Sequence, residues 1–289
     1  MDMKKYLIVY NPQSGNKAKQ YIAKVTHQLE NQNTDYHFFA TTGSTQQDQS
    51  QLVNLVAQSS DVISIGGDGT LNLLCNVLAN KKISLGIIPC GTGNDFARNF
   101  YHSNDDILSI VTGHKTMTVD LGWCNDRYFI NVLGIGYDAL VVKACNTNKK
   151  IYFRSLFYLW HALKYLPFYR EETVELESKI FNKNEKTFLA AFGNGTFYGG
   201  GMNITPHADI SDGLLDCCWV GKLSFYNKCK CLIKLFSGAH LNEKNIEYCQ
   251  GKEFKIKSVN QPIEADGEFI GYSPAHIKII QSALLLKIG

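Results

Sequence analysis

The sequence DVISIGGDGTLN, residues 61–72, decides the fold of this chain. Val62, Ile63 and Ile65 form an apolar run that is typical of a short buried strand. The turn GGDGT at 66–70 has little side-chain bulk, and the leucines after it recur at helical spacing. A strand, a glycine turn and a helix in this order aim backbone N–H groups and a positive dipole end at an anion. The stretch therefore predicts an anion site at the start of a helix.

Asp68 puts a carboxylate inside this predicted anion site. A carboxylate beside phosphate groups is favourable when Mg²⁺ lies between them. The glycine spacing is not the dinucleotide pattern G-x-G-x-x-G, and no Gly-Lys-Ser/Thr follows as in a P-loop. A tight strand-to-helix turn without any ligand explains the same residues equally well, so the turn alone leaves both interpretations open.

Length and composition indicate an ordinary globular chain with room for two modest domains. The 289 residues are 45% hydrophobic and 19% charged. A net charge of +3 is too small to indicate a nucleic-acid partner and allows a mild attraction to anionic surfaces. The apolar run at residues 7–9 is too short for a signal peptide, and no stretch approaches the ~20 apolar residues of a membrane span.

The cysteines indicate reduced thiols. There are nine of them, and none forms a C-x-x-C pair; Cys217 with Cys218 and Cys229 with Cys231 are the closest. This spacing suits neither a zinc site nor a disulfide framework. Reduced thiols in a cytoplasmic protein are the simpler interpretation.

The first 121 residues are expected to alternate strands with helices. The strands are predicted at 7–9, 36–40, 62–65 and 84–88. This βαβαβαβ order is typical of a parallel sheet with helices on both faces. Three of the loops after strands are rich in Gly, Ser, Thr and Asn, and ligands bind beyond the carboxyl ends of such strands. We therefore expect these loops to face one site.

Strands dominate the rest of the chain. They are predicted at 116–121, 128–133, 173–177, 188–192, 215–220, 254–256, 263–265 and 277–279. At 173–177 the apolar Val174 and Leu176 alternate with Glu175 and Glu177. Many strands with few helices between them suggest an antiparallel sandwich. The expected fold class is α/β plus all-β, with a parallel α/β domain at 1–121 and a β-sandwich domain at 122–289.

Two helices are expected inside the second domain. Residues 152–166, YFRSLFYLWHALKYL, are apolar nearly all round. One face would carry Phe153, Leu156, Phe157, Trp160 and Leu163. Such a helix is buried or borders an apolar ligand, and a core position is favoured. Residues 223–240 set an apolar face against Lys228, Lys230 and Lys234, which either lies on an acidic membrane or, more commonly, is solvated.

Acidic residues occupy turns and strand ends along the chain. Besides Asp68 they are Asp120, Asp209, Asp212, Asp216, Asp266 and Glu268. Each has an ordinary explanation, since Asp-Gly is common in hairpin turns and Asp120 could be an exposed strand residue. In the functional interpretation Asp68, Asp120 and Asp266 gather around Mg²⁺. Glu268 would then deprotonate a hydroxyl, as phosphoryl transfer requires. Spacing alone cannot bring these residues together.

Six motifs in a fixed order support a family resemblance. They are NPQSG at 11–15, GGDGTLN at 66–72, PCGTGND at 89–95, VDLG at 119–122, DGLLD at 212–216 and DGE at 266–268. With them the chain resembles the bacterial diacylglycerol kinase and lipid kinase family, relatives of the sphingosine kinases. The motifs span nearly the whole chain, and six in order are far more specific than any one of them.

The resemblance implies an ATP-binding N-terminal domain, a lipid-binding β-sandwich and an active site in the cleft between them. The chain end, residues 281–289, can pack back on the first domain. The implied activity is transfer of the ATP γ-phosphate to a lipid hydroxyl, with diacylglycerol converted to phosphatidic acid as the leading candidate. The implied setting is phospholipid biosynthesis by a cytoplasmic protein that is peripheral at the inner membrane face, without nucleic acid. A homodimer is compatible with it.

The resemblance also assigns roles by motif. The nucleotide would be held by Asn11, Pro12, Gln13, Ser14, Gly15, Thr41, Gly66, Gly67, Asp68, Gly69, Thr70, Leu71, Asn72 and Thr92. Asp68, Asp120 and Asp266 would form a water-linked network at the catalytic Mg²⁺. Glu268 would be the general base on the lipid hydroxyl. A second, structural Mg²⁺ would take Asp212 and backbone oxygens at Asp209 and Leu214, so that only one carboxylate is needed there.

Leu73 departs from the family pattern, which usually has an acidic residue after the asparagine of the glycine loop. Leucine can neither accept a hydrogen bond nor ligate a metal, and this favours the alternative of a non-catalytic lipid or nucleotide sensor. A kinase of another lipid or of a long-chain base is a further alternative. NAD kinases and phosphofructokinases share a Gly-Gly-Asp-Gly loop, but the asparagine loop at 11–15, the PCGTGND motif and the aromatic middle region argue against them.

Overall fold

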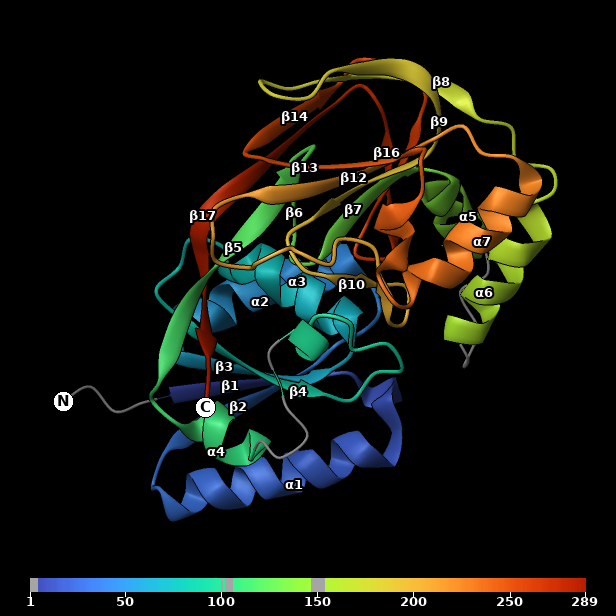
Figure 1. Ribbon diagram of the computed structural model, residues 1–289. Helices are drawn as coiled ribbons and strands as arrows, with labels where there is room; N and C mark the ends of the chain where they lie inside the picture. Colours follow the sequence, from blue (N-terminus) through green and yellow to red (C-terminus); the bar gives the residue numbers. More distant parts are fainter. Residues whose placement is uncertain (1–4, 100, 102–105, 147–153) are drawn as a thin grey trace. The chain divides into compact units, whose positions relative to one another are not determined.

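The computed structural model describes residues 5–99, 101, 106–146 and 154–289, without the side chains of residue 146 and residues 154–159. Contacts divide the chain into two units, shown with their elements in Figure 1. Unit 1 is Met1–Asp120 with Gln281–Gly289, and unit 2 is Leu121–Ile280. The chain passes from one unit to the other inside two strands, β5 (Thr116–Cys124) and β17 (Ala275–Lys287).

Unit 1 is an α/β domain. Its other elements are β1 (Lys5–Tyr10), η1 (Pro12–Ser14), α1 (Gly15–Asn31), β2 (Asp35–Ala40), α2 (Thr45–Ala57), β3 (Asp61–Gly66), α3 (Asp68–Leu78), β4 (Ser84–Pro89), η2 (Ala97–Asn99) and α4 (Ile107–Thr112). The strands pair in parallel in the order β2-β1-β3-β4-β17. In Figure 1, α1 and α4 lie on one face of this sheet and α2 and α3 on the other. The predicted parallel α/β architecture is confirmed.

Alternating strand residues build the core of unit 1. Tyr6 and Ile8 of β1 and Ile63 and Ile65 of β3 pack against α1 and α4 in one buried cluster. Side chains that alternate along a strand point to opposite faces, so the residues between them face α2 and α3. Complete burial of an aliphatic side chain contributes about 1.5–3 kcal/mol, which makes these strands the rigid base beneath the loops.

A buried ion pair fixes the end of β17 in unit 1. The ammonium of Lys287 lies 2.8 Å from the Asp61 carboxylate and 2.9 Å from the hydroxyl of Tyr6. Ser84 donates a hydrogen bond of 2.5 Å to the same carboxylate. Only 1% of Lys287 is exposed. Residues 281–287 are thereby attached to the first strands by a charge pair as well as by backbone pairing with β4.

Unit 2 is largely antiparallel. Its strands are β6 (Arg127–Phe129), β7 (Val132–Gly136), β8 (Glu172–Glu177), β9 (Lys183–Gly193), β10 (Phe197–Tyr198), β11 (Met202–Asn203), β12 (Leu215–Gly221), β13 (Ile246–Gly251), β14 (Glu253–Ile256), β15 (Pro262–Ala265) and β16 (Glu268–Tyr272). Its helices are α5 (Tyr137–Asn146), α6 (Arg154–Tyr165), α7 (Phe225–Leu235) and η3 (Ala239–Asn242). Among the helices of the described ranges, none is long and apolar enough to cross a bilayer.

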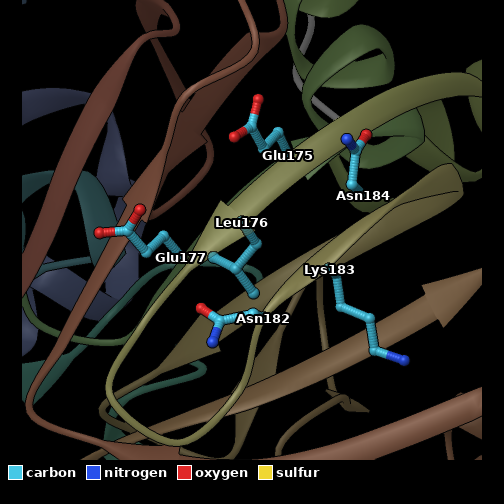
Figure 2. Close-up of a pocket in the computed structure, with 6 residues that line it drawn as sticks. All are labelled: Glu175, Leu176, Glu177, Asn182, Lys183 and Asn184. Atoms are coloured by element: carbon cyan, nitrogen blue, oxygen red, sulfur yellow. The ribbon is translucent and has the colours of Figure 1, made fainter.

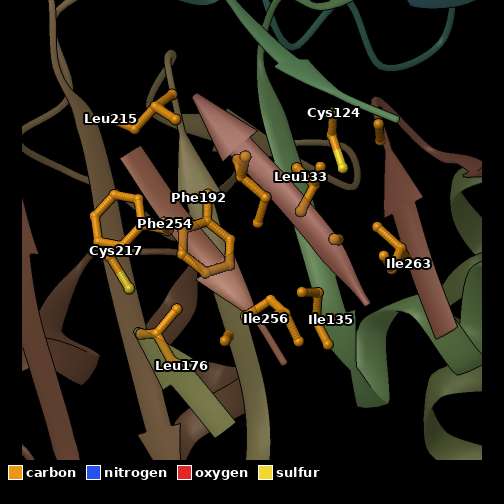
Figure 3. Packing of buried hydrophobic residues seen from close by; sticks show 14 of the residues in the cluster. Cys124, Leu133, Ile135, Leu176, Phe192, Leu215, Cys217, Phe254, Ile256 and Ile263 are labelled. Carbon is orange, nitrogen blue, oxygen red and sulfur yellow. The ribbon is translucent and has the colours of Figure 1, made fainter. Parts of the chain in front are cut away.

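The strands of unit 2 separate two apolar cores. Figure 3 shows the first, in which Leu133, Phe192, Cys217, Phe254 and Ile263 converge from five different strands. The second lies on the other face, where the intervening strand residues pack against helices α5, α6 and α7. The alternation along β12 illustrates this, because its odd-numbered residues enter the first core and its even-numbered apolar residues the second. A sheet buried on both faces fits the predicted sandwich class.

Several sequence-based expectations for unit 2 need correction. The predicted strand 128–133 is two strands, because the backbone N–H groups of Ile130 and Asn131 bind the Asp266 carboxylate at 2.9 Å instead of a neighbouring strand. Helix α5 was not predicted. The helix expected at 223–240 ends at Leu235, and Gly238 then takes a φ of 72°.

The aromatic helix predicted at 152–166 was expected to be buried in the core, and its described side chains contradict this expectation. Tyr152 and Phe153 lie outside the described residues, as do the side chains of Leu156 and Phe157. The side chains of Trp160 and Leu163 are 55% and 57% exposed. That face of α6 therefore points to solvent, and the buried contacts come from the neighbouring His161 and Leu166.

Candidate active site

Four loops of unit 1 meet at the carboxyl edge of its sheet. The N–H of Asn11 donates to Ile65 O at 3.2 Å, and the N–H of Thr41 donates to Tyr10 O at 2.9 Å. The N–H of Cys90 donates to Gly66 O at 2.7 Å. Because parallel strands end at the same edge, these bonds place the loops after β1, β2, β3 and β4 side by side. The prediction that such loops face one another is consistent with this geometry.

Asn11 forms the first of these loops. Its side-chain oxygen accepts a hydrogen bond of 2.9 Å from the N–H of Gln13, which caps the short helix η1. Gly15 then takes a φ of 73°, a conformation that residues with a side chain rarely adopt. The asparagine and glycine of this motif thus shape the turn from β1 into α1, and they expose its backbone between them.

The glycines of the loops after β3 and β4 let two backbones touch. A Cβ atom on Gly91 would lie 2.5 Å from the Cα of Gly67, and one on Gly67 would lie 3.0 Å from the Cα of Gly91. Neither position has room for a side chain. By contrast, a Cβ on Gly69 would meet nothing within 4 Å. The close approach of Gly67 and Gly91 therefore packs the two loops directly against each other.

Asp68 ties these two loops together. Its carboxylate accepts hydrogen bonds from the backbone N–H groups of Asn94, Asp95 and Phe96. Burial raises the pKa of Asp68, and these N–H donors only partly oppose the shift. A Cβ on Gly93 would come within 2.9 Å of the carboxylate. The first residue of α3 is therefore a partly buried acid with a fixed orientation. It lines a hollow of about 10 Å³, close to the space of one water molecule.

The remaining predicted nucleotide residues differ in their exposure to solvent. Gly66, Thr70, Leu71 and Asn72 are buried, whereas Pro12, Gln13, Gly15, Gly69 and Thr92 are exposed. Ser14 and Thr41 are intermediate. Buried side chains of α3 hold the loop in place. A ligand can touch the side chains of Pro12, Gln13, Ser14, Thr41 and Thr92, and only the backbone at Gly15 and Gly69.

Two cations at this edge were not predicted. The Lys17 ammonium donates to the backbone oxygen of Pro89 at 3.1 Å. The Arg98 guanidinium donates to Gly93 O at 3.2 Å and lies 3.6 Å from the Asp95 carboxylate. Positive charges beside exposed backbone N–H groups suit phosphate. The signal was present in the sequence, because Lys17 and Arg98 lie two and three residues after the ends of the NPQSG and PCGTGND motifs.

Asp120 has a structural partner within unit 1. Its carboxylate accepts a hydrogen bond of 2.6 Å from the N–H of Ser282, and only 3% of the residue is exposed. The bond joins β5 to the bend in β17, where Ser282 has a φ of 51°. Asp120 is therefore not the exposed strand residue that its ordinary interpretation suggested.

Asp266 and Glu268 flank a tight turn in unit 2. Asp266 has a φ of 49°, and its carboxylate accepts the N–H groups of Ile130, Asn131 and Val132 at 2.9–3.2 Å. Glu268 forms an ion pair with Arg127 of β6, and 37% of its side chain is exposed. The turn thus presents one carboxylate locked by backbone donors and another that is held by arginine yet open to solvent.

Two further carboxyl groups lie beneath this turn. Asp138 and Glu264 are 8% and 1% exposed. Among the described residues, Oδ2 of Asp138 and Oε1 of Glu264 lack a hydrogen-bond partner. Burial raises the pKa of Asp138 to about 7 and that of Glu264 well above its usual range. Sequence analysis missed both, since an isolated Asp or Glu in an apolar stretch carries no motif.

The loop at 209–214 is built from carboxylates and backbone oxygens. Asp209 accepts the N–H and hydroxyl of Ser211 at 2.9 and 2.7 Å, and Asp212 accepts the N–H of Leu214 at 2.9 Å. Burial raises the pKa of the neighbouring Asp216, and the charge of Asp212 adds to the shift. The donor set consists of oxygens, which hard divalent cations prefer. Within the described ranges, no three His, Cys, Asp or Glu side chains converge as a metal site.

A hollow of unit 2 lies away from these carboxylates. Figure 2 shows it on the β8–β9 hairpin, lined by Glu175, Leu176, Glu177, Asn182, Lys183 and Asn184. Its volume is about 290 Å³. None of these six residues belongs to a motif, so volume alone does not mark the residues that carry the chemistry.

The lysines predicted on α7 all form ion pairs. Lys228 is buried and lies 2.9 Å from Glu171. Lys230 and Lys234 both contact the carboxylate of Glu243, at 3.0 and 2.5 Å. The helix also exposes the apolar side chains of Phe225, Tyr226 and Ile233, and Phe236 directly after it is exposed as well. The predicted solvated lysine face is therefore wrong for Lys228, whereas the side chains of Lys230 and Lys234 are 42% and 32% exposed.

Two family models match the chain and divide it much as the fold does. The diacylglycerol kinase catalytic domain matches residues 5–124, and the YegS C-terminal NAD kinase beta sandwich-like domain matches residues 131–287. A diacylglycerol kinase of Mycobacterium tuberculosis (strain ATCC 25618 / H37Rv) is 33% identical over 249 residues, 81% of this chain and 78% of that protein. The chain belongs to the diacylglycerol kinase family.

Other relatives agree with this membership. A diacylglycerol kinase of Bacillus subtilis (strain 168) is 29% identical over 282 residues, 94% of this chain and 92% of that protein. The crystal structure of a diacylglycerol kinase from Bacillus anthracis str. Sterne superposes with a TM-score of 0.71 at 19% identity, covering 100% of this chain and 98% of that one. This likeness shows the shared fold. As a member of the family, the chain is an ATP-dependent lipid kinase, and the motif-based resemblance is confirmed.

Proposed function

We propose that this protein transfers the γ-phosphoryl group of ATP to the hydroxyl of diacylglycerol and so forms phosphatidic acid. The observation that carries the proposal is the fixed set of loops around Asp68, next to relatives that are named diacylglycerol kinases. Phosphoryl transfer depends mainly on positioning and charge stabilisation, which rigid loops at a sheet edge can provide. The proposal names the lipid, which family membership leaves open.

In this proposal the nucleotide lies over the loops of unit 1. The exposed backbone at Gly69 would donate to phosphate oxygens, and Lys17 and Arg98 would add positive charge. Asp68 fits a role near Mg²⁺, because burial of this carboxylate disfavours its charged form and a cation would restore it. When bound, the ion would neutralise phosphate charge, and Asp68, Asp120 and Asp266 would orient its water shell. The donors are all oxygens, as Mg²⁺ requires.

Glu268 would accept the proton of the lipid hydroxyl. Its side chain is open enough to meet a substrate, and Arg127 restricts its orientation through the ion pair. A general base must be within hydrogen-bond reach of the proton that it removes, so this orientation matters as much as basicity. Arg127 thus acts as a positioning residue for the base.

The structural Mg²⁺ is assigned to the loop at 209–214. Asp212 would supply its carboxylate and Asp209 and Leu214 their backbone oxygens. The observation in favour is the accumulation of negative charge, since Asp212 adds to the raised pKa of Asp216. A bound cation would relieve that repulsion and stiffen the loop before β12, without a part in the chemical step.

A lipid substrate requires contact with a membrane, and the outer faces of α6 and α7 suit it. They expose Trp160, Leu163, Phe225, Tyr226, Ile233 and Phe236. Aromatic and aliphatic side chains on one helix face insert into the boundary between headgroups and acyl chains. We expect Ile233→Asp to weaken sedimentation with vesicles of phosphatidylcholine and phosphatidylglycerol. Val53→Asp, which changes an exposed apolar residue of unit 1, should sediment as the wild type.

The reaction is tested by ADP release and product analysis with purified protein, ATP and Mg²⁺. Vesicles would contain diacylglycerol, monoacylglycerol, sphingosine, ceramide or no added lipid. Formation of phosphatidic acid only with diacylglycerol would support the proposal. Phosphorylation of a different lipid instead would identify that lipid as the substrate and contradict the choice of diacylglycerol. Binding of ATP without turnover on any lipid would favour the sensor alternative.

The assigned roles are tested by two substitutions. Asp68→Asn and Glu268→Gln should each lower lipid-dependent turnover by at least about 100-fold, since proton transfer and charge positioning contribute factors of this size. Glu175→Gln, in the hollow of the β8–β9 hairpin, is the matched control and should remain active. Wild-type turnover in Glu268→Gln would reject its role as the base.

A further inference from the structure

Two cysteines face each other across the outermost pair of strands in unit 2. Cys217 of β12 and Cys249 of β13 are direct partners in the antiparallel register. Within the described sheet, β13 pairs with β12 alone, so it is an edge strand. Cys217 is buried in the first core, as Figure 3 shows, and Cys249 packs against that core while remaining partly open to solvent.

The geometry of this pair matches that of a disulfide. Directly opposed residues of antiparallel strands have Cα atoms about 4.5 or 5.5 Å apart, depending on the hydrogen-bonding position. Disulfides span Cα separations of about 4.4–6.8 Å. The thiols of Cys217 and Cys249 already form a hydrogen bond with each other. Rotation of two side chains is then enough to join the sulfurs, and the strands can keep their register.

We infer that Cys217 and Cys249 form a disulfide when hydrogen peroxide oxidises the protein. The Cys249 thiolate attacks one oxygen of hydrogen peroxide, becomes a sulfenic acid and releases hydroxide, which is protonated to water. The sulfur of Cys217 then attacks the Cys249 sulfur and displaces the hydroxyl group as a second water. The two thiols lose two electrons and two protons in total, and the peroxide is reduced to two waters.

The two thiols differ in a way that suits these roles. The hydrogen bond from Cys217 lowers the pKa of Cys249, which makes a thiolate more accessible at the solvent-facing sulfur. Burial raises the pKa of Cys217, so this thiol stays protonated and unreactive toward the oxidant until a sulfenic acid forms beside it. The partly open cysteine reacts first and the buried one resolves.

The neighbouring Cys218 is excluded by the strand itself. It points to the opposite face, where it packs with Cys231 in the second core. The residues flanking Cys249 lie on that face too, because Tyr248 and Gln250 both bind the Asp216 carboxylate. The disulfide would therefore clamp β13 from one face while Asp216 holds it from the other.

The experiment uses the full-length protein, reduced and then treated with hydrogen peroxide. Unreacted thiols are blocked, and the protein is digested with trypsin for mass spectrometry. Cleavage after Lys244 and Lys252 releases residues 245–252, in which Cys249 is the only cysteine. Residues 187–222 form the peptide with Cys217 and Cys218. The expected product is these two peptides linked, two hydrogen masses below their sum, and separated again by dithiothreitol.

Three variants decide between the neighbouring cysteines. Cys218→Ala should keep the crosslink, whereas Cys217→Ala and Cys249→Ala should lose it. Cys249→Ala changes a partly exposed edge residue, so it serves if Cys217→Ala fails to fold. A crosslink that needs Cys218, or Cys249 recovered only as sulfinic acid, would overturn the proposal.

A second measurement tests whether the disulfide holds β13 against β12 in the oxidised protein. Amide hydrogen exchange at residues 248–250 should slow after crosslinking, because an edge strand that opens locally can no longer leave β12. The melting temperature should rise in the same sample. Unchanged exchange in fully crosslinked protein would contradict the inferred link between these strands.

Discussion

At Gly134 the missing side chain leaves room for two buried carboxyl groups. A Cβ atom there would collide with Oδ2 of Asp138 and come within 2.9 Å of Oε1 of Glu264. The two groups stay in the protein although burial disfavours their charged forms. Glu264 uses its other oxygen to accept the N–H of Gly267 at 2.8 Å. The pair thereby supports the turn between Asp266 and Glu268 from below.

This pair predicts a pH dependence of stability. The pKa of Asp138 is 3.8 in its ordinary form and about 7 in the folded protein, so between these values the folded state binds more protons than the unfolded chain. The free energy of unfolding should therefore fall as pH rises from about 4 to 7, by at most about 1.4 kcal/mol per unit for one proton. Urea denaturation across this range measures it. Asp138→Asn should flatten the profile, and an unchanged slope would contradict the assignment.

Arg127 offers a second prediction at this scale. Arg127→Gln removes the ion pair but leaves Glu268 in place, so the base loses its orientation. We expect a fall in kcat of up to about 100-fold, as for other small misplacements of a reacting group. KM for ATP should change little, because the substitution lies outside unit 1. A larger effect on KM than on kcat would show that Arg127 binds nucleotide instead.

Residue roles were the hardest part to predict from sequence. Asp266 was assigned by motif to a magnesium network, and the structure adds three backbone donors that no spacing could reveal. Lys17 and Arg98 were missed because the motifs end just before them. Leu73, the departure from the family pattern, is 5% exposed, so its side chain is buried on α3. Partners that are distant in sequence decide each of these cases.

At the scale of elements, the contact between the loops after β3 and β4 makes a sharp prediction. Gly91→Ala would force a Cβ to 2.5 Å from the Cα of Gly67, which neither backbone can accommodate without moving. Such overpacking costs about 1–3 kcal/mol. The melting temperature should fall, and titration calorimetry should show weaker ATP binding.

Gly69→Ala is the matched control for folding. The added methyl group meets nothing within 4 Å, and the position lies in the first turn of α3. Its melting temperature should stay at or above that of the wild type. Equal destabilisation by the two substitutions would mean that the loops do not depend on the close approach.

Strands were easier to predict than the interruptions between them. The apolar runs placed β3, β8 and β12 nearly correctly because each is a local pattern. The break between β6 and β7 depends on Asp266, which lies far along the chain. Helix α5 follows Gly136, whose φ of 100° ends β7, and its apolar residues do not distinguish a helix from a strand.

For the whole molecule, the fold class and family could be predicted because six motifs and two contrasting element orders agree. The pairing of strands in unit 2 could not, since register depends on contacts between distant segments. The ion pair of Lys287 with Asp61 could not be predicted for the same reason, because the two residues are far apart in the sequence. Their side chains are only 1% and 8% exposed.

Lys287→Met should therefore destabilise unit 1 by about 3–5 kcal/mol, because it leaves the buried Asp61 uncompensated. Burial raises the pKa of Asp61, but the hydrogen bonds from Lys287 and Ser84 lower it by more. The pKa of Asp61 in the folded protein is therefore below its usual value. The stabilisation is present above the unfolded pKa of about 3.9 and is lost as pH falls through the folded value. Urea denaturation should show a large destabilisation by Lys287→Met at pH 7 and a small one at pH 3. Asp61→Asn with Lys287→Met should recover part of the loss.

The return of β17 to the first sheet also sets an order of events on the ribosome. Residues 121–280 form one uninterrupted segment, and unit 2 can fold as soon as this segment has left the exit tunnel. Unit 1 is synthesised earlier, yet the open side of β4 has no neighbour until residues 281–287 are made. The part of the chain that is translated first is thus completed last, and chaperones would meet its exposed strand edge during that delay.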